Sequence, residues 1–323
     1  MKQQRIIGLS IGIIKNGKVI KAKGYGRANI ELDAPASEKT VYKIGSISKQ
    51  FIAAGIMKLV QEGKLKVSDP VTKFIKDAPV KWSAITIRHL LNHTSGLPLD
   101  PPGFDGMKDE ADSIYIRTAF TDTLAFPTGS KYEYSNFGYF VLADIIRIIS
   151  HLSFPDYMKR YVFDECGMSN TRTTSLEAIV PNRADGYIRN AKDTIQNAPN
   201  YIALRPSGAF LSNINDLLKW EMEMQHNKLL TPQSWNQLWG DTIKTPLTMD
   251  NEAMYYGYGW MTNKVNGKQF VHHGGSMPGF KSVYFRYIQD KTAVIILTNA
   301  DSADAYGIAF GVSDLLQAED KGK

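Results

Sequence analysis

Ser46 and Lys49 have the residue types and the spacing of a nucleophile held next to a base. They lie three apart in Ser46-Ile47-Ser48-Lys49, the one place where a lysine follows a serine at this distance. On a helix both side chains share one face, with Cβ atoms about 5–6 Å apart. A serine hydroxyl needs such a neighbour to attack, and free N–H groups at a helix start stabilise an oxyanion. The alternative is a serine N-cap followed by a surface lysine, which average composition yields about once by chance.

Two further motifs have side chains or backbone that could complete such a site. Tyr134-Ser135-Asn136 follows a predicted turn and precedes a predicted helix, so its phenol and amide could project from a loop. The alternative there is a packed tyrosine with an asparagine N-cap. His273-Gly274-Gly275-Ser276 ends a predicted strand, where glycines let a substrate backbone approach closely. Its alternative is a bulge or turn.

Other patterns are weaker. His89 and His93 are four apart on a predicted helix but lack a third ligand, which favours packing or capping over a metal site. The segment 274–282 resembles a phosphate loop, yet Phe280 stands where the lysine should follow glycine directly. Cys166 is the single cysteine, so an internal disulfide is impossible, and its apolar neighbours indicate a core thiol. We expect no metal and no cofactor.

Predicted strands occupy both ends of the chain. Runs rich in β-branched residues are joined by Asn-Gly turns at 16–17 and 266–267, which is the strongest short hairpin signal. A helix over Ala303–Leu316 follows the last strand. Both ends are therefore expected to build one α+β lobe. The predicted strands are Ile6–Ile14, Val19–Tyr25, Gly259–Lys264, Lys268–His272, Val283–Tyr287 and Ala293–Thr298, with a shorter strand-like run at Val41–Gly45.

The middle of the chain has helical periodicity. The helix predicted over Ser48–Gln61 would end at Gly63, a suitable C′ residue. The segment Pro98–Gly106 is rich in proline, glycine and aspartate, which predicts a surface loop able to rim a substrate cleft. The other predicted helices are Thr86–Asn92, Gly138–Ile149 and Asn215–Met224.

Composition excludes several classes of protein. The 323 residues are 43% hydrophobic and 22% charged, which excludes a disordered tail, a collagen-like fibre and a small disulfide scaffold. The net charge of +6 is spread along the chain, so no nucleic-acid partner is indicated. No apolar run approaches the roughly 18 residues of a membrane span. The charged start Met1–Arg5 lacks the apolar segment of a signal peptide, so the chain is either cytosolic or has lost a leader.

Taken together, the three motifs in this order resemble the serine β-lactamase and penicillin-binding-protein superfamily, and within it the class C β-lactamase branch. That branch also contains D,D-carboxypeptidases, D-amino-acid peptidases and carboxylesterases. The resemblance covers about Ile6 to Leu316. Relatives are often periplasmic or secreted and have a helix before the first strand, so Met1 is expected to fall inside that helix, and localisation stays open. The phrases typical of the branch are Ile85–Leu97, Tyr134–Tyr139 and Gly274–Phe280.

The resemblance implies roles for single residues. Ser46 would be the acylated nucleophile, and Lys49 would lower the cost of its deprotonation. Tyr134 would act as general base and then pass a proton to the leaving group. Asn136 would orient Lys49 and the acyl group of the substrate. The backbone N–H groups of Ser46 and Ser276 would form the oxyanion hole.

The resemblance also implies an α+β fold, in which an antiparallel sheet is flanked by helices and joined by a mostly helical second lobe. We therefore expect one β-lactamase-like catalytic unit over 1–323. Its α/β lobe would come from about 1–50 and 255–323, and its mainly helical lobe from about 51–254. The catalytic site would lie in the cleft between the lobes.

The third motif departs from the Lys-Thr-Gly or Lys-Ser-Gly of many relatives. Here His273 stands in place of the lysine, Gly274 has no hydroxyl, and Gly275 follows. Histidine is only partly charged at neutral pH, so an anionic lactam or a D-Ala terminus should bind less well. We therefore expect a serine hydrolase of esters or of D-amino-acid amides and peptides. The alternatives are a β-lactamase or D-Ala-D-Ala carboxypeptidase, an acylated penicillin-binding sensor without turnover, and an acyltransferase.

Overall fold

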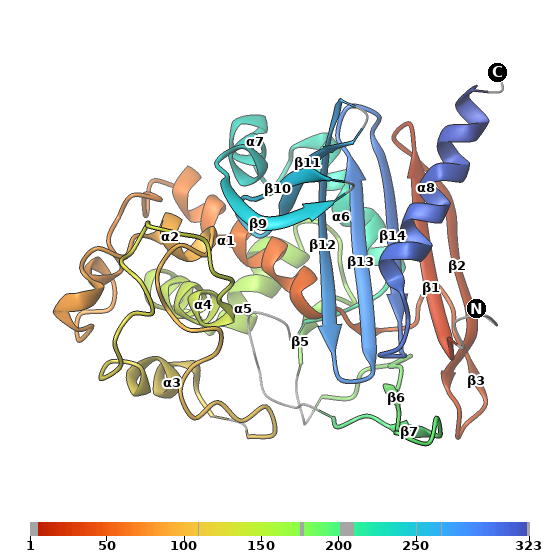
Figure 1. Cartoon of the computed structure of the whole chain (residues 1–323), viewed down its shortest axis with the longest axis horizontal. Coiled ribbons are helices and arrows are strands. Elements are labelled where there is room, and N and C mark those ends of the chain that lie inside the picture. Colours follow the sequence, from red (N-terminus) through yellow and green to blue (C-terminus); the bar gives the residue numbers. More distant parts are fainter. Residues whose placement is uncertain are drawn as a thin grey trace.

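One nine-stranded antiparallel sheet organises the computed structural model, which describes residues 6–108, 110–174, 178–200, 210–249, 251–265 and 267–321 (Figure 1). The strand order is β3-β2-β1-β14-β13-β12-β11-β10-β9. The α+β class and the antiparallel sheet are as predicted. The strands are β1 Gly8–Lys15, β2 Lys18–Asn29, β3 Ala34–Pro35, β9 Ile243–Met249, β10 Glu252–Tyr256, β11 Met261–Val265, β12 Lys268–Met277, β13 Phe280–Tyr287 and β14 Thr292–Thr298.

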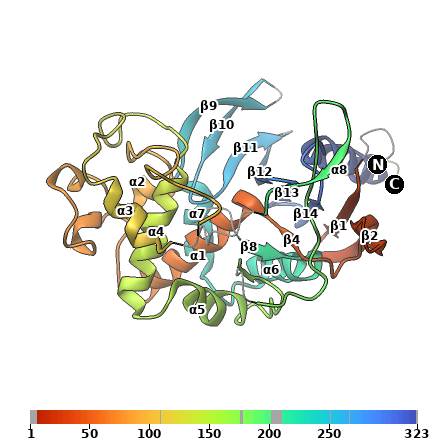
Figure 2. The same cartoon turned by 90° about the horizontal axis from the view of Figure 1, so that it is seen from below.

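The two ends of the chain meet in the middle of this sheet, where β1 pairs with β14 and Ile11 lies opposite Ile296. Side chains alternate between the two faces of a strand. Ile11 and Ile13 belong to the apolar cluster that contacts α8 (Ala305–Lys321). Gly12 instead faces α6 (Ile214–His226), and a Cβ atom there would lie 2.9 Å from Ile214. Figure 2 shows α6 and α8 on opposite faces of the sheet.

The predicted hairpins are present. Asn16 and Gly17 have φ angles of 51° and 75°, the left-handed values that a tight two-residue turn between strands requires. Asn266 of the second predicted turn lies outside the described residues. Its flanking strands are β11 and β12, and β12 continues through the His273–Ser276 motif instead of stopping before it.

A helical region lies beside the sheet (Figure 1). Helix α1 spans Ser48–Gln61 and is followed by Gly63 at a φ of 69°, as predicted. Helix α4 begins at Asn136, two residues before the predicted start, because Ser135 caps it by accepting a hydrogen bond from the Gly138 N–H. Helix α2 is shorter than predicted, since Thr86 and Asn92 are its caps. The helices of this region are α1, α2 Ile87–Leu91, α3 Asp112–Thr118, α4 Asn136–Ser150, α5 Phe154–Met158 and α7 Pro232–Gly240.

Several short elements connect the sheet to the helical region. The strand predicted over Val41–Gly45 is reduced to β4, which joins a small second sheet, and Pro98–Gly106 contains no helix or strand, as predicted. Among the described residues, no single helix has the length and hydropathy to cross a bilayer, and only the bent pair 136–150 and 154–163 meets that criterion. The small strands are β4 Tyr42–Lys43, β5 Arg172–Thr173 and β8 Phe210–Ser212 in one sheet, and β6 Tyr187–Arg189 and β7 Ile195–Asn197 in another.

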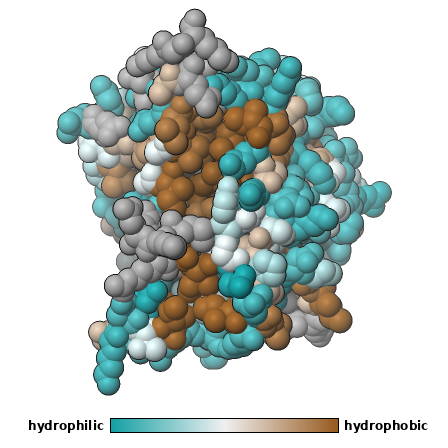
Figure 3. Space-filling model, turned by 90° about the vertical axis from the view of Figure 1, so that its right-hand side faces the viewer, coloured by the Kyte–Doolittle hydropathy of each residue, from teal (hydrophilic) through white to brown (hydrophobic). Residues whose placement is uncertain are grey.

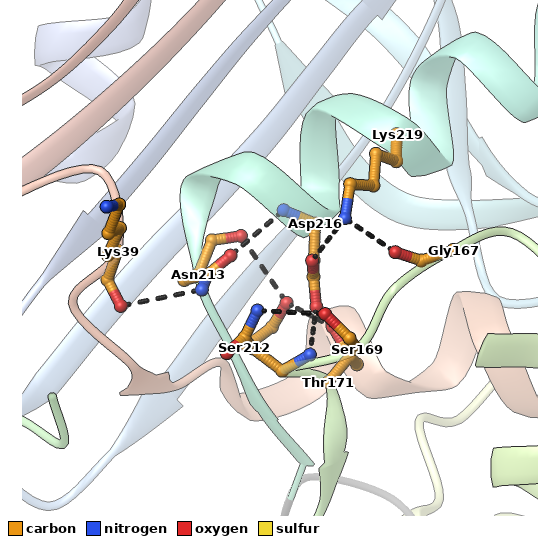
Figure 4. A network of polar contacts seen from close by, with 9 residues as sticks. Lys39, Gly167, Ser169, Thr171, Ser212, Asn213, Asp216 and Lys219 are labelled. Carbon is orange, nitrogen blue, oxygen red and sulfur yellow. Dashed lines mark hydrogen bonds and ion pairs between the residues drawn. The ribbon is translucent and has the colours of Figure 1, made fainter. Parts of the chain in front are cut away.

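A buried carboxylate attaches the start of α6 to the loop before β5. Asp216 is fully buried and accepts hydrogen bonds from the Asn170 N–H at 2.7 Å and the Thr171 hydroxyl at 3.0 Å. Its other oxygen lies 3.2 Å from the Lys219 amine (Figure 4). Asn213 caps the helix by accepting from the Asp216 N–H. Because a buried charge is tolerated only when it is well paired, this network is a structural anchor.

An apolar groove lies between α8 and the strands β1 and β2, on the face shown in Figure 3. Its volume is about 530 Å³. Ile20 on β2 is 53% exposed and Leu315 on α8 is 69% exposed, so apolar side chains reach solvent along both walls. The lining residues include Leu9, Ile11, Ile13, Ile20, Tyr25, Ile308, Val312 and Leu315.

Candidate active site

Ser46 lies in a single 3₁₀ turn, η1 (Gly45–Ile47), that leads directly into α1. Gly45 has a φ of 56°, and a Cβ atom there would lie 2.5 Å from the backbone nitrogen of Ser276. The missing side chain therefore lets the serine turn contact β12. The Ser48 hydroxyl holds the turn by donating to the Gly45 carbonyl at 2.7 Å. The Ser276 backbone nitrogen therefore lies beside the turn that carries Ser46, a proximity that the predicted oxyanion hole requires.

Lys49 points from the first turn of α1 toward Ser46. Its amine lies 3.2 Å from Ser46 Oγ and 2.9 Å from Asn136 Oδ1. The residue is fully buried. Burial lowers the pKa of Lys49 to about 7, and the nearby Asp100 carboxylate opposes part of that shift. Near neutral pH a large fraction of the amine is therefore uncharged and able to take a proton.

Tyr134 covers the Lys49 amine, which lies 4.8 Å from the centre of the phenol ring. Burial raises the pKa of the Tyr134 phenol well above its usual range, and the Ser46 hydroxyl opposes that rise. The phenol oxygen is buried without a well-formed hydrogen bond among the described residues, although Ser46 is close enough to influence it. At rest Tyr134 is therefore a neutral phenol, suited to giving a proton rather than to accepting one.

Asn136 links Lys49 to a residue that the sequence did not single out. Its amide nitrogen donates to Asp100 Oδ1 at 3.0 Å, while its oxygen accepts from Lys49. Asp100 lies in the Pro98–Gly106 loop, which was predicted to rim a cleft. The composition of that loop indicated its exposure, but no local pattern indicated that one of its carboxylates reaches the amide.

His273 is held as a neutral imidazole. Its Nδ1 lies 2.6 Å from the Gly274 carbonyl oxygen, which can only accept, so Nδ1 carries the proton. Its Nε2 therefore accepts from the Tyr256 hydroxyl at 2.9 Å. Burial and the nearby Lys49 lower the pKa of His273 to about 3. The expectation of a partly charged histidine is thus replaced by an uncharged one, because the ring is buried.

The remaining residues of the third motif differ in what they face. A Cβ atom on Gly275 would lie 2.0 Å from the Ile44 carbonyl, so only glycine allows this approach to the serine turn. Ser276 is exposed, and its hydroxyl accepts from Lys281 at 2.8 Å. Its backbone nitrogen, not its side chain, faces the serine turn.

The two histidines set aside in the sequence serve in capping and packing, as predicted, but His93 lies beyond the end of α2 instead of sharing a helix with His89. His89 forms a capping box with Thr86 at the start of α2. His93 is fully buried and accepts from the Ser135 N–H at 3.1 Å. Its ring packs at a tilt against Tyr134 and Tyr256, with ring centres 4.2 and 4.4 Å away. His93 therefore packs against both tyrosine rings and helps to hold them in place. Cys166, predicted to be a core thiol, is only partly buried at the edge of the core, and burial raises its pKa. Among the described residues there is no group of three His, Cys, Asp or Glu side chains that could hold a metal ion.

A family model described as Beta-lactamase matches residues 1–314. The chain belongs to the beta-lactamase family. Within that family, the chain is 30% identical over 314 residues to Protein flp of Staphylococcus aureus, which covers 94% of this chain and 61% of that protein. The chain therefore spans less than two thirds of the length of that relative.

Solved structures of the beta-lactamase family agree with the fold. The octameric penicillin-binding protein homologue from Pyrococcus abyssi superposes with a TM-score of 0.87 and 29% identity, covering 98% of this chain and 75% of that one. The D-amino acid amidase from Ochrobactrum anthropi, in complex with D-phenylalanine, has a TM-score of 0.86 at 21% identity, covering 100% of this chain and 96% of that one. The second similarity concerns the fold alone.

Proposed function

We propose that the chain is a serine hydrolase that forms an acyl-enzyme on Ser46 and cleaves esters or D-amino-acid amides and peptides. The observation that carries the proposal is the 3.2 Å contact between Ser46 Oγ and a buried Lys49 amine whose pKa is lowered to about 7. A nucleophile and its base at this distance are the minimum that acyl transfer requires. We also propose that the whole chain forms one catalytic unit, with the site between its sheet and its helical region.

In the proposed first step, Ser46 Oγ attacks the carbonyl carbon of the substrate and its proton passes to the Lys49 amine. The oxygen that becomes negative lies between the N–H groups of Ser46 and Ser276. The neutral phenol of Tyr134 then gives its proton to the leaving oxygen or nitrogen, and the Lys49 ammonium returns a proton to Tyr134. Water reverses these transfers to release the acid and regenerate Ser46 Oγ–H.

This assignment moves the role of general base from Tyr134, where the resemblance suggested it, to Lys49. The reason is that burial shifts the pKa values of the two groups in opposite directions. It disfavours the charged form of each, so it lowers the pKa of the Lys49 ammonium and raises the pKa of the Tyr134 phenol. The neutral amine and the neutral phenol are therefore the resting forms.

A fluorophosphonate probe and a substrate panel test the proposal. Peptide mass spectrometry should find the label on Ser46, and Ser46→Ala should abolish both labelling and turnover. Ser276→Ala is the matched control, because it removes a hydroxyl from the same site but keeps the backbone N–H, and it should still be labelled. Labelling of Ser95 or Ser276 with Ser46 unmodified would contradict the assignment.

The panel also separates the alternative functions. It comprises short-chain p-nitrophenyl esters, D-amino-acid amides, a chromogenic cephalosporin and a D-Ala-D-Ala peptide, and we expect the esters or amides to have the highest kcat/KM. A faster lactam or D-Ala-D-Ala reaction would favour a β-lactamase or carboxypeptidase. One equivalent of product without turnover would indicate a sensor, and products that incorporate an added alcohol or amine would indicate an acyltransferase.

A further inference from the structure

The space beside Gly274 is filled by a side chain from α8, which follows later in the chain. A Cβ atom on Gly274 would lie 2.7 Å from Tyr306 Cε2 and 2.9 Å from its hydroxyl oxygen. Tyr306 is the second residue of α8, which packs on this face of the sheet. Relatives with a threonine or serine at the position of Gly274 have a hydroxyl there, whereas this chain has the edge of a phenol.

Contacts on two sides fix the Tyr306 ring in that position. Its hydroxyl lies 3.2 Å from Nδ1 of His272, and its ring centre lies 5.4 Å from that of Phe285. The side chain is only partly buried, so one edge stays accessible. A ring that is held by packing and still reaches the surface of a site excludes ligand atoms from the volume it occupies.

Tyr306 lies against the segment of β12 that is next to Tyr134. Tyr134, the proposed proton donor to the leaving group, has its ring centre 6.3 Å from the ring of His273. Tyr306 lies against the next residue, Gly274, and is close enough to Tyr134 to help raise the pKa of its phenol. A leaving group protonated by Tyr134 would therefore have the His273–Gly274 segment and the Tyr306 ring as neighbours.

We propose that Tyr306 is a specificity-determining residue that restricts the site to small, uncharged leaving groups. The Tyr306 ring occupies volume that the second residue of a peptide would need, and neither Tyr306 nor His273 offers a charge to a carboxylate. The preferred substrates would be primary amides and simple alkyl esters, which release ammonia or a short alcohol. This inference rests on the proposed function and refines it.

Pairs of substrates with one acyl group and two leaving groups test the inference. D-alaninamide releases ammonia and D-Ala-D-Ala releases an amino acid. D-alanine methyl ester releases methanol, and the ester of D-alanine with lactate releases a hydroxy acid. The wild type should prefer the smaller leaving group in each pair. Tyr306→Ala should raise kcat/KM for the larger one relative to the smaller by about tenfold or more, whereas Tyr306→Phe should keep the wild-type preference.

Phe310→Ala is the matched control for lost packing. Phe310 lies one turn further along α8 and contacts the same Phe285 ring, with centres 4.7 Å apart. The Phe310→Ala variant should have a lower thermal stability than the wild type but the same leaving-group preference. Tyr306→Leu, which is shorter but still apolar, replaces Tyr306→Ala if that variant does not fold.

A reciprocal pair of variants tests the contact itself. Gly274→Ala should lose activity, because its Cβ would meet the Tyr306 ring at 2.7 Å. Gly274→Ala combined with Tyr306→Ala should recover activity. Threonine at 274 would meet the same ring, so introducing a Lys-Thr pair at 273–274 should improve lactam acylation only when Tyr306 is also shortened.

The outcomes distinguish this inference from the function beneath it. Absence of Ser46 labelling and of all turnover would overturn the proposed function and with it this inference. A labelled, active Tyr306→Ala or Tyr306→Leu enzyme with an unchanged preference would overturn only the inference. A wild-type enzyme that prefers the carboxylate-bearing leaving group would also overturn the inference but not the proposed function.

Discussion

The Tyr256 hydroxyl lies 2.9 Å from Nε2 of His273, a ring that burial keeps uncharged. Because Tyr256 donates to Nε2 while Nδ1 donates to the Gly274 carbonyl, both ring nitrogens of the neutral histidine are satisfied. Protonation of Nε2 would create a buried cation, and the Tyr256 hydroxyl would have to rotate because its proton could no longer point at Nε2.

The His273 ring should therefore stay neutral throughout the working pH range. Nitrogen-15 NMR of the imidazole should show the Nδ1–H tautomer from pH 8 to pH 5, because burial lowers the pKa of His273 to about 3. Tyr256→Phe removes the donor to Nε2 and should move the pKa of His273 upward. A wild-type ring that protonates near pH 6.5 would contradict the proposed neutral leaving-group side.

The pH dependence of activity should report Lys49. The uncharged amine is the proposed base, so kcat/KM for an ester should rise with pH through a midpoint near 7 and then level off. Lys49→Arg cannot supply a neutral base and should lose several orders of magnitude. Tyr134→Phe should also lose most activity, and the double variant should be little worse than either single one. A midpoint near 10 would argue against Lys49 as the base.

Burial of Lys49 should also lower the stability of the fold. Its pKa is about 7 in the folded protein and about 10.4 in the unfolded chain, so the unfolded chain binds an extra proton between these values. The free energy of unfolding should therefore rise with pH in this window, by up to about 1.4 kcal/mol per unit. Lys49→Met should be more stable than the wild type at pH 7, and the difference should shrink toward pH 10. If the free energies of unfolding of the two proteins, measured by denaturation, changed with pH in the same way, the prediction would be wrong.

Gly45→Ala should impair activity more than stability. The added Cβ would lie 2.5 Å from the Ser276 nitrogen, pushing the two proposed oxyanion donors apart, and loss of one such donor costs about 10²–10³ in kcat. Gly63→Ala is the matched control, since Gly63 also has a positive φ of 69° but has no atom within 4 Å of a Cβ. It should cost about 1 kcal/mol of stability and leave kcat unchanged. Equal effects of the two changes on kcat would disprove the proposed close approach.

Asp216→Ala should lower the free energy of unfolding by about 3 kcal/mol, because it removes a buried charge from its donors and leaves them unpaired. Lys219→Ala removes the half-exposed partner and should cost less than about 1 kcal/mol. Urea denaturation measures both. Ester turnover per folded molecule should not change, since no catalytic group contacts this network. Equal destabilisation by the two variants would contradict the anchoring role.

Local patterns predicted the parts of the site that lie close together in sequence. The Ser46–Lys49 spacing requires only one helical turn, and the helix over Ser48–Gln61 is specified by its own apolar face and by Gly63 at its end. The Asn-Gly turn at 16–17 likewise specified its hairpin, because positive φ angles are required at both positions. Such features depend on neighbours within a few residues.

The residues that were missed act across long separations. Asp100 contacts Asn136 from a loop without periodicity, and Tyr306 covers Gly274 from a helix that begins two strands later. No pattern within ten residues of Tyr306 distinguishes it from an ordinary tyrosine of an amphipathic helix. The hydrogen bond to Nε2 of His273 comes from Tyr256, which belongs to a strand that the sequence did not indicate.

Strand β14 lies between β1 and β13, and the N-terminal hairpin reaches the rest of the sheet only through it. A chain leaving the ribosome therefore carries β1 and β2 for almost three hundred residues before their partner is made. Contacts closed over such distances form slowly, because loop entropy must be lost before any pairing is gained. During that wait the apolar face of the hairpin is exposed to other chains. A chaperone that binds apolar strands should therefore increase the yield of folded protein, whereas slower elongation, which lengthens the wait, should decrease it.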